Sequence, residues 1–211
     1  MSSTLDNMQF ETPLLLCNSR RVSENMDKIT REIIQADFEK YDIGHPFLSR
    51  FTFSEKTILF RYMRNLRLLE EAKRKVEGGA NFLCLIPYCF RFFKHRRLSV
   101  KYDIWIAPFS AGRGFHMTHL GYRRIDSFVK IGVNCTVLPG VLFGKKKPGI
   151  EHSVINVGNN CYIGAGATIL GPCTIGNNVT IAAGAVVCTD FPEDNLVIGG
   201  VPAVILKRCT D

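Results

Sequence analysis

The chain has 211 residues, 46% of them hydrophobic, and a formal net charge of +8. This is enough apolar material for the core of one sizeable domain, or of a domain with an appendage. No apolar run is long enough to span a bilayer, and the N-terminus lacks the pattern of a secretory signal peptide, so we expect a cytoplasmic protein.

The net positive charge and the spacing of the cysteines limit the kinds of ligand and partner that the chain is expected to bind. Eight cysteines are present, but no two have the CxxC spacing, so neither a zinc site nor a disulfide framework is indicated. The positive charge is compatible with nucleic acid, with an anionic small molecule or with weak association with an anionic membrane surface. The basic residues are not interleaved with aromatic residues as in a nucleic-acid reader motif, so we expect no nucleic-acid partner.

Residues 1–100 are predicted to form a helical region. Only three of the chain's 18 glycines precede residue 106, and apolar residues recur at helical intervals in two stretches. The first predicted helix follows Ser23 as its N-cap, and the second follows Ser54. The first ~20 residues carry no such pattern and are expected to be loosely structured.

A strongly apolar stretch, NFLCLIPYCFRFF, covers residues 81–93 and is followed by the basic run KHRR. Pro87 is expected to break it. We favour a buried helix pair with a basic end, and keep an interfacial membrane anchor as the alternative.

Residues 101–211 contain a repeat of six residues. From Val157 the hexapeptides read VGNNCY, IGAGAT, ILGPCT, IGNNVT and IAAGAV. The first position is always Val or Ile, and the fifth is small or compact. A period of six fits neither a helix nor an alternating strand, and predicts a chain that turns a corner after each hexapeptide. Three sides then make a coil of about 18 residues, and coils stack through parallel-strand hydrogen bonds.

The residues at the turns of the predicted coils, and one interruption of the repeat, also fit this interpretation. Glycine and asparagine at the corners supply positive φ at little cost. Between Phe143 and Val157 the segment GKKKPGIEH lacks the aliphatic repeat. We therefore predict an extruded loop over residues 144–153. A rod of such coils cannot bury its own ends, so the helical region is expected to act as a cap.

These stretches resemble the hexapeptide-repeat acyltransferases, in particular serine acetyltransferase and its relatives encoded with polysaccharide biosynthesis genes. The matching segments are AGRGFHMTHLG, GVNCTVLPGVLFG, IGAGATILG, IGNNVTIAAGAVV and VIGGVPAVILK, between about residues 103 and 207. The resemblance implies a mainly β fold, a left-handed parallel β-helix with an N-terminal helical region. It also implies a homotrimer and acyl transfer from coenzyme A to a hydroxyl group.

The resemblance also implies catalytic residues. The family motif GxxxxHxG places the catalytic histidine at His119, and a neutral imidazole can take the proton of the attacking hydroxyl. The family orients this imidazole with an upstream aspartate, for which Asp103 is the nearest candidate, one position out of register. A metal role for His116 lacks a convincing third ligand, so we expect no metal and a groove-lining or solvated side chain there.

The family loop that borders coenzyme A corresponds to the basic segment after Gly144. Lysine can serve there as a point charge for the phosphates of the coenzyme. The family's small residues beside the pantetheine arm correspond to two alanines one coil apart. The implied acyl-CoA contacts are Gly144, Lys145, Lys146, Ala165, Ala183 and Lys207.

The acceptor pocket departs from the serine acetyltransferase pattern. Thr118 replaces the aspartate before the catalytic histidine, and Ser153 and Val154 replace an Arg–His pair, with His152 displaced nearby. An amino-acid carboxylate could be held by Arg123 or Arg124, and Tyr122 offers a face for a sugar ring. The predicted acceptor contacts are Thr118, Tyr122, Arg123 and His152.

The sequence therefore predicts an acetyl-CoA-dependent O-acyltransferase that acts on a small-molecule hydroxyl of a sugar or polysaccharide precursor. The first alternative is serine O-acetylation for cysteine synthesis. An alternative of a different class is a non-catalytic β-helix that serves as a binding or assembly module.

Overall fold

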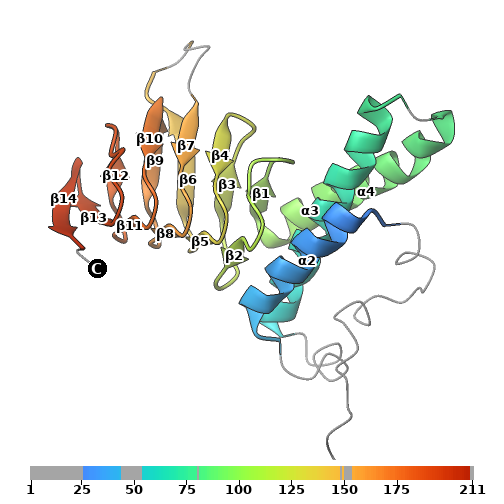
Figure 1. Cartoon of the computed structure of the whole chain (residues 1–211), viewed down its shortest axis with the longest axis horizontal. Helices are drawn as coiled ribbons and strands as arrows, with labels where there is room; N and C mark the ends of the chain where they lie inside the picture. The colour runs from blue at the N-terminus through green and yellow to red at the C-terminus, as the bar shows by residue number, and fades with distance from the viewer. Residues whose placement is uncertain (1–25, 44–53, 80, 148, 150–153, 210–211) are drawn as a thin grey trace, which may run out of the picture.

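The computed structural model describes residues 26–43, 54–79, 81–147, 149 and 154–209. Ser23 and His152 lie outside the described residues. Figure 1 shows two regions side by side, a group of helices at one end and a rod of stacked strands that leads away from it. The helices are α2 (Lys28–Tyr41), α3 (Glu55–Glu77), the short 3-10 helix η3 (Phe82–Cys84) and α4 (Leu85–Tyr102).

Both predicted helices are present, but the described part of the first one begins at a later residue than predicted. The carboxylate of Asp27 accepts a hydrogen bond of 2.6 Å from the Thr30 amide, so the described helix α2 is capped by Asp27 and begins at Lys28. The second predicted helix, α3, begins directly after Ser54 as expected, although within the described part of the chain the Ser54 side chain makes no capping bond. α4 continues to Tyr102, just beyond the boundary predicted for the helical region.

The prediction that the apolar stretch is broken and buried is wrong. Pro87 lies in the first turn of α4, where backbone N–H groups have no partner within the helix, so proline is tolerated. Only one side of α4 is covered, at His95 and Ser99, whereas Phe90 and Phe93 are 62% and 69% exposed. The helix therefore has an uncovered apolar side.

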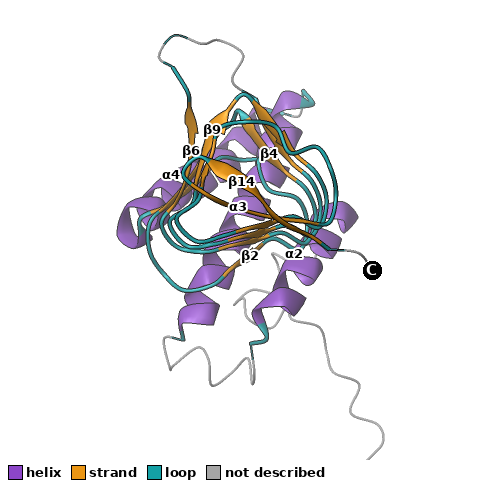
Figure 2. Ribbon diagram, turned by 90° about the vertical axis from the view of Figure 1, so that its left-hand side faces the viewer, coloured by secondary structure: helices purple, strands orange, loops and turns teal. Residues whose placement is uncertain are grey.

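The rod is a parallel β-helix of three sheets, with a roughly triangular outline when viewed along its axis (Figure 2). Its first sheet holds β1 (Ile104–Ile106), β3 (Arg123–Ile125), β6 (Val141–Lys145), β9 (Thr168–Gly171) and β12 (Val186–Val187). Its second sheet holds β4 (Val129–Ile131), β7 (Ile155–Val157) and β10 (Cys173–Ile175). Its third sheet holds β2 (His116–Met117), β5 (Thr136–Val137), β8 (Tyr162–Ile163), β11 (Thr180–Ile181), β13 (Leu196–Gly200) and β14 (Ala203–Arg208).

The coil length agrees with the repeat in the sequence. Ile163 pairs with Ile181, and Ile155 with Cys173, each 18 residues apart. The first hexapeptide position is buried throughout, and so is the small fifth position. The buried first-position residues are Val157, Ile163, Ile169, Ile175, Ile181 and Val187. Each contributes about 1.5–3 kcal/mol by leaving water, so the aliphatic repeat is the core of the rod.

One corner of the rod shows why its turns need asparagine and glycine. Asn134, Asn160 and Asn178 have φ between 55° and 58°, the left-handed region that asparagine tolerates well. At the adjoining glycines the requirement is space, because a Cβ on Gly158 would lie 2.5 Å from the carbonyl oxygen of Gly176. The coils thus stack too closely for a side chain at this position.

The extruded loop follows β6. Across it, Phe143 pairs with Ile169, 26 residues further along the chain instead of 18. The additional residues lie between β6 and β7 in the chain, which supports the predicted interruption of the repeat.

Buried charges join the helices to the first coil. The Arg67 guanidinium on α3 lies 2.8 Å from the Asp37 carboxylate on α2 and 3.2 Å from the Glu70 carboxylate. It also donates to the carbonyl oxygens of Ala111 and Gly112, at 2.7 and 2.6 Å. Asp37 and Glu70 in turn accept hydrogen bonds from coil amides. We call Arg67, Asp37 and Glu70 the Arg67 cluster; it supplies partners to backbone groups at the open end of the rod.

Candidate functional site

His119 lies at the corner that follows β2, between the third and first sheets. Its side chain is 74% exposed, and its backbone has φ 49°. A histidine in this left-handed region carries strain that its surroundings must offset. An exposed imidazole held on a constrained turn is accessible to a substrate.

The side chain of Arg123 holds this turn from inside. It is fully buried, and it donates to the carbonyl oxygens of Thr118, His119, Gly121 and Val137. Burial lowers the pKa of Arg123 to about 10, so the guanidinium is still charged at neutral pH. The sequence pattern predicts Arg123 at the acceptor. The structure instead commits this side chain to backbone carbonyls beneath His119, where it positions the turn.

The partner of His119 is Glu55, the first residue of α3. Its Oε2 atom lies 3.3 Å from the Nδ1 of His119, and its other carboxylate oxygen accepts a hydrogen bond from the Leu120 amide. The tautomer that donates from Nδ1 to this carboxylate leaves Nε2 unprotonated. The pair therefore has the arrangement of an oriented general base.

Asp103, the predicted partner, lies elsewhere. It ends α4 with φ 54°, and its carboxylate accepts a hydrogen bond of 3.2 Å from the Trp105 indole. Within one chain the structure does not bring Asp103 to His119, and it gives the expected orienting position to Glu55.

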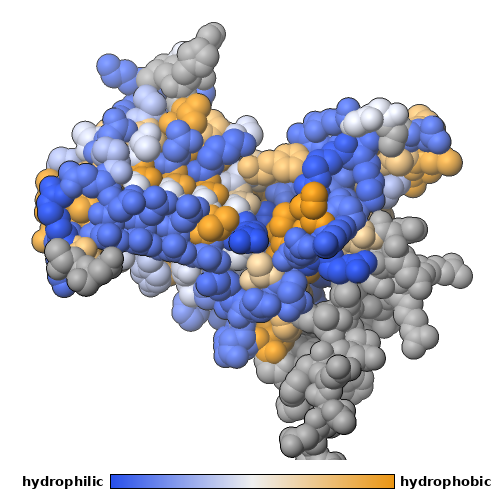
Figure 3. All heavy atoms as spheres, in the orientation of Figure 1, coloured by the Kyte–Doolittle hydropathy of each residue, from blue (hydrophilic) through white to orange (hydrophobic). Residues whose placement is uncertain are grey.

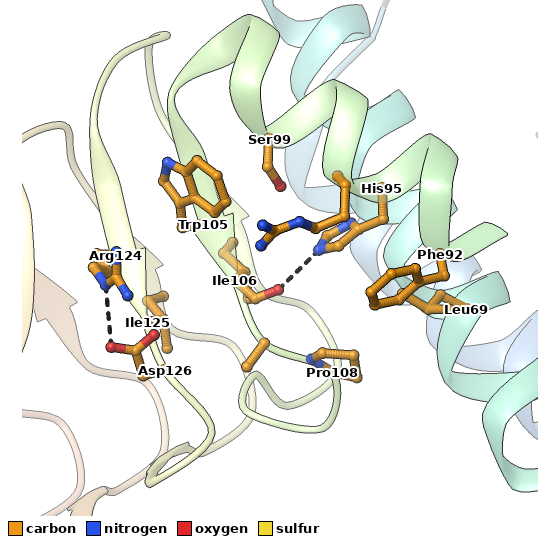
Figure 4. A pocket seen from close by; sticks show the side chains of 12 residues that line it. Leu69, Phe92, His95, Ser99, Trp105, Ile106, Pro108, Arg124, Ile125 and Asp126 are labelled. Carbon is orange, nitrogen blue, oxygen red and sulfur yellow. Dashed lines mark hydrogen bonds and ion pairs between the residues drawn. The ribbon is translucent and has the colours of Figure 1, made fainter. Parts of the chain in front are cut away.

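A cavity of about 410 Å³ lies near Asp103 (Figure 4). One wall comes from α4, with His95 and Ser99, and the other from β1 and β3, with Trp105 and Arg124. His95 contacts the carbonyl oxygen of Ile106 at 3.0 Å. Arg124, the alternative to Arg123 as a carboxylate contact, lines this cavity, but His119 and Tyr122 do not, so the cavity is separate from the His119 turn.

His116 is half-buried and packs against α2. Its ring lies 5.0 Å from the Tyr41 ring in an edge-on arrangement. Burial, aided by the charges of Lys40, Lys56 and Arg123, lowers the pKa of His116. No group of three His, Cys, Asp or Glu side chains arranged to hold a metal ion is found within the described residues.

The two alanines lie on the same edge of the rod as His119. Ala165 follows β8 and Ala183 follows β11, and both are exposed. The Gly184 amide donates to the Ala165 carbonyl oxygen at 2.8 Å, so the two corners are stacked on adjacent coils. This placement agrees with the prediction, and leaves a strip of small side chains beside the imidazole edge.

The basic loop leaves from a different corner, between the first and second sheets. Figure 2 shows β6, from which the loop leaves, in the upper part of the triangle, while β2, which precedes His119, lies at the base. Lys145 lies over the Phe128 ring at 5.8 Å, and the Lys146 ammonium donates to the Pro172 carbonyl oxygen at 3.0 Å. Gly144 lies within β6. A single chain therefore does not bring the lysines to the histidine.

The remaining predicted contacts vary in accessibility. Tyr122 is exposed, and Lys207 is exposed on β14. The Thr118 hydroxyl is buried and has no hydrogen-bond partner among the described residues. His152 lies outside the described residues.

Two residues of the turn were not predicted correctly: Glu55 was missed, and Arg123 was assigned to the acceptor. Glu55 precedes His119 by 64 residues, and its only local signal is that of an acidic residue at a helix start. Arg123 was noticed, but its burial follows from the alternation of β3, in which residues 123 and 125 face inward. This alternation could have separated Arg123 from the exposed Arg124.

A family model and several solved structures are similar to this chain. The family model described as bacterial transferase hexapeptide (six repeats) matches residues 155–189. No curated protein matches the chain in sequence.

Among solved structures, serine acetyltransferase from Neisseria gonorrhoeae is 23% identical, with a TM-score of 0.65 over 90% of this chain and 71% of its own. Soybean serine acetyltransferase complexed with serine is 24% identical, with a TM-score of 0.62 over 85% and 70%. A serine acetyltransferase in complex with CoA is 20% identical, with a TM-score of 0.62 over 84% and 69%. These similarities confirm the left-handed β-helix with an N-terminal helical region, and the chain is serine acetyltransferase-like in fold.

Proposed function

We propose that this protein is a CoA-dependent O-acetyltransferase in which His119 is the general base. The observation that carries the proposal is the exposed imidazole whose Nδ1 lies 3.3 Å from the Glu55 carboxylate. The hexapeptide match and the solved structure of a similar protein with CoA support acetyl-CoA as the donor.

In the proposed reaction, Nε2 of His119 takes the proton of the acceptor hydroxyl as the oxygen attacks the thioester carbonyl. The tetrahedral intermediate collapses, the carbon–sulfur bond breaks and the imidazolium returns the proton to the thiolate of CoA. Glu55 stabilises the imidazolium formed between these steps, and Arg123 fixes the turn that carries the ring. The products are the O-acetyl ester and free CoA.

We further propose that the working unit is a homotrimer whose sites lie between neighbouring copies. His119 and the basic loop occupy different corners of the triangular rod, so they meet only if the loop of one copy reaches the histidine edge of the next. In this arrangement Lys145, Lys146 and Lys207 contact phosphates of CoA, and Ala165 and Ala183 leave room for the pantetheine arm.

For the acceptor, we propose a hydroxyl of a sugar or polysaccharide precursor. Arg123 is fully buried and the Thr118 hydroxyl is enclosed, so neither offers a charge or an open polar group to a zwitterion. Tyr122, by contrast, is exposed and can stack on a sugar ring. Serine is the second candidate, because a similar solved structure holds serine.

The test is release of thiol from acetyl-CoA with serine, homoserine, sugars and nucleotide sugars as acceptors. His119→Ala should lower turnover on the order of 10²- to 10⁴-fold, whereas the matched His116→Ala variant should retain most of it. Equal losses at both positions contradict the role of His119.

Two further outcomes identify the alternatives. A kcat/KM for serine near 10⁴ M⁻¹s⁻¹ or above, the low end of ordinary enzyme efficiency, makes serine the substrate. No thiol release with any acceptor, from a protein that still binds CoA, favours the non-catalytic module.

A further inference from the structure

Large apolar side chains are exposed at the outer end of the helical region. Figure 1 shows that α4 begins at the end of the molecule opposite β14, and Figure 3 shows hydrophobic surface there. The side chains on η3 and the first half of α4 are 62–80% exposed. They are Phe82, Leu83, Ile86, Phe90 and Phe93, and we call them the apolar tip.

The apolar tip continues into a basic face on the same side of α4. Ile86, Phe90, Phe93 and Arg97 follow one another at intervals of three or four residues, which places them on one side of a helix. His95 and Ser99, on the other side, are buried. The outward side is therefore apolar in its first half, and in its second half it carries Arg97 and Lys101 beside the exposed Val100.

A groove joins the two halves. It has a volume of about 590 Å³ and is lined by Phe90, Phe93, Lys94, Arg97, Leu98 and Lys101. Between residues 82 and 102 the sequence has five lysines and arginines and no aspartate or glutamate. An apolar floor with a cationic rim matches an acyl chain beneath an anionic headgroup.

We propose that this surface seats the protein on an anionic lipid bilayer. The apolar tip enters the boundary between headgroups and acyl chains, while Arg97 and Lys101 lie at the level of the lipid phosphates. The helix lies on the bilayer and does not cross it: none of the described helices is long and apolar enough to span a membrane. This role goes beyond the proposed acyl transfer and does not depend on it.

The charge of the face decides between lipid and a second copy of the chain. A symmetric contact between two copies places the same surface on both sides. It would bring Lys94, Arg97 and Lys101 against the same three cations of the other copy, and residues 82–102 contain no acidic residue to pair with them. An anionic bilayer neutralises these cations and at the same time removes the apolar tip from water, so lipid is the better match.

The test is sedimentation of the full-length protein with vesicles of phosphatidylcholine, with and without phosphatidylglycerol. Binding should require phosphatidylglycerol. Arg97→Glu together with Lys101→Glu should weaken it at least about 30-fold, because each cation near an anionic surface contributes to attraction. Phe90→Ser together with Phe93→Ser should weaken it at least about 10-fold, because buried aromatic surface is lost. All four positions face solvent, so the fold should tolerate these changes.

Two matched controls separate this surface from general basic or apolar character. Lys146→Glu with Lys147→Glu changes the loop, and Val204→Ser with Leu206→Ser changes exposed apolar residues of β14. Both controls should bind the vesicles as the unchanged protein does. No binding to phosphatidylglycerol vesicles, or equal loss in the controls, overturns the proposal. A lower assembly mass of the α4 variants in the absence of lipid also overturns it, and assigns the face to contact between copies.

Discussion

The two regions of this molecule have different interiors. The rod is filled by aliphatic residues at one repeated position, and every coil presents nearly the same set to its neighbours. The junction between the helices and the rod contains the Arg67 cluster, in which charged side chains are buried with partners on three separate segments. The comparison teaches that a repeated interior distributes stability over many equivalent contacts, whereas the junction concentrates it in a few unique ones.

The largest effect is expected from replacing Arg67, the residue at the centre of the junction. Arg67→Met should lower the free energy of unfolding by about 3–5 kcal/mol, because Asp37 and Glu70 remain buried without their counter-charge. Denaturant unfolding measures the loss. Arg74→Met is the matched control on the same helix: its ion pair with Asp27 is partly exposed and should contribute less than about 1 kcal/mol. Similar small losses for both variants would show that the junction is no more concentrated than the surface.

A single core residue of the rod should matter somewhat less. Ile181 is a fully buried side chain in one coil. Ile181→Ala should lower the free energy of unfolding by about 2–4 kcal/mol, because apolar contacts are lost and a cavity is left. The same denaturant experiment on Ile205→Ala, at an exposed position of β14, should show little change. If both changes cost the same, the aliphatic repeat is not the source of the rod's stability.

The third prediction concerns the contact through which the two regions build one site. Glu55→Gln should lower kcat about 10-fold, because a neutral amide stabilises the imidazolium less well than a carboxylate does. The KM for acetyl-CoA should not change, since Glu55 is expected to make no contact with the donor. Glu77→Gln, at the other end of the same helix, is the control. A raised KM with unchanged kcat would make Glu55 a structural residue only.

The smallest effect is expected in the pH dependence of the junction. Burial, and secondarily the Arg96 charge, lower the pKa of His95 in the folded protein. As the pH falls below about 6.5, the unfolded chain therefore takes up the proton first, and stability that is present above this pH is lost. The free energy of unfolding should fall by at most about 1.4 kcal/mol per pH unit through this group.

His95→Gln should reduce that slope between pH ~6.5 and pH ~5. Some slope should remain, because the pKa of His116 is lowered as well. Denaturant unfolding at several pH values measures the difference. An unchanged slope in the variant would mean that His95 does not titrate with unfolding in this range.

The sequence predicts the repeated coils of the rod well, and it predicts the contacts between the rod and the helices poorly. The coils were predictable because every hexapeptide from Val157 to Val187 begins with an aliphatic residue, and this repeat can be recognised without knowledge of distant contacts. The Arg67 cluster and the Glu55–His119 contact were not predictable, because they join residues 30 or more positions apart through single pairs without a repeat. The apolar segment before His95 was misjudged for a related reason: hydrophobicity alone does not say which side of a helix finds a neighbour.

The last strand of the rod has a consequence for how long the rod can be. β14 runs antiparallel to β13, whereas β13 and the preceding strands of the third sheet are parallel. A parallel coil presents unpaired backbone groups along its final edge, and a second rod could in principle continue the stack end to end. Because the chain reverses direction there, the terminal edge no longer matches the strand direction of another copy's first coil. The reversed strand at one end, and the helices that cover the first coil at the other, leave neither end of the rod as a parallel edge that another copy could continue.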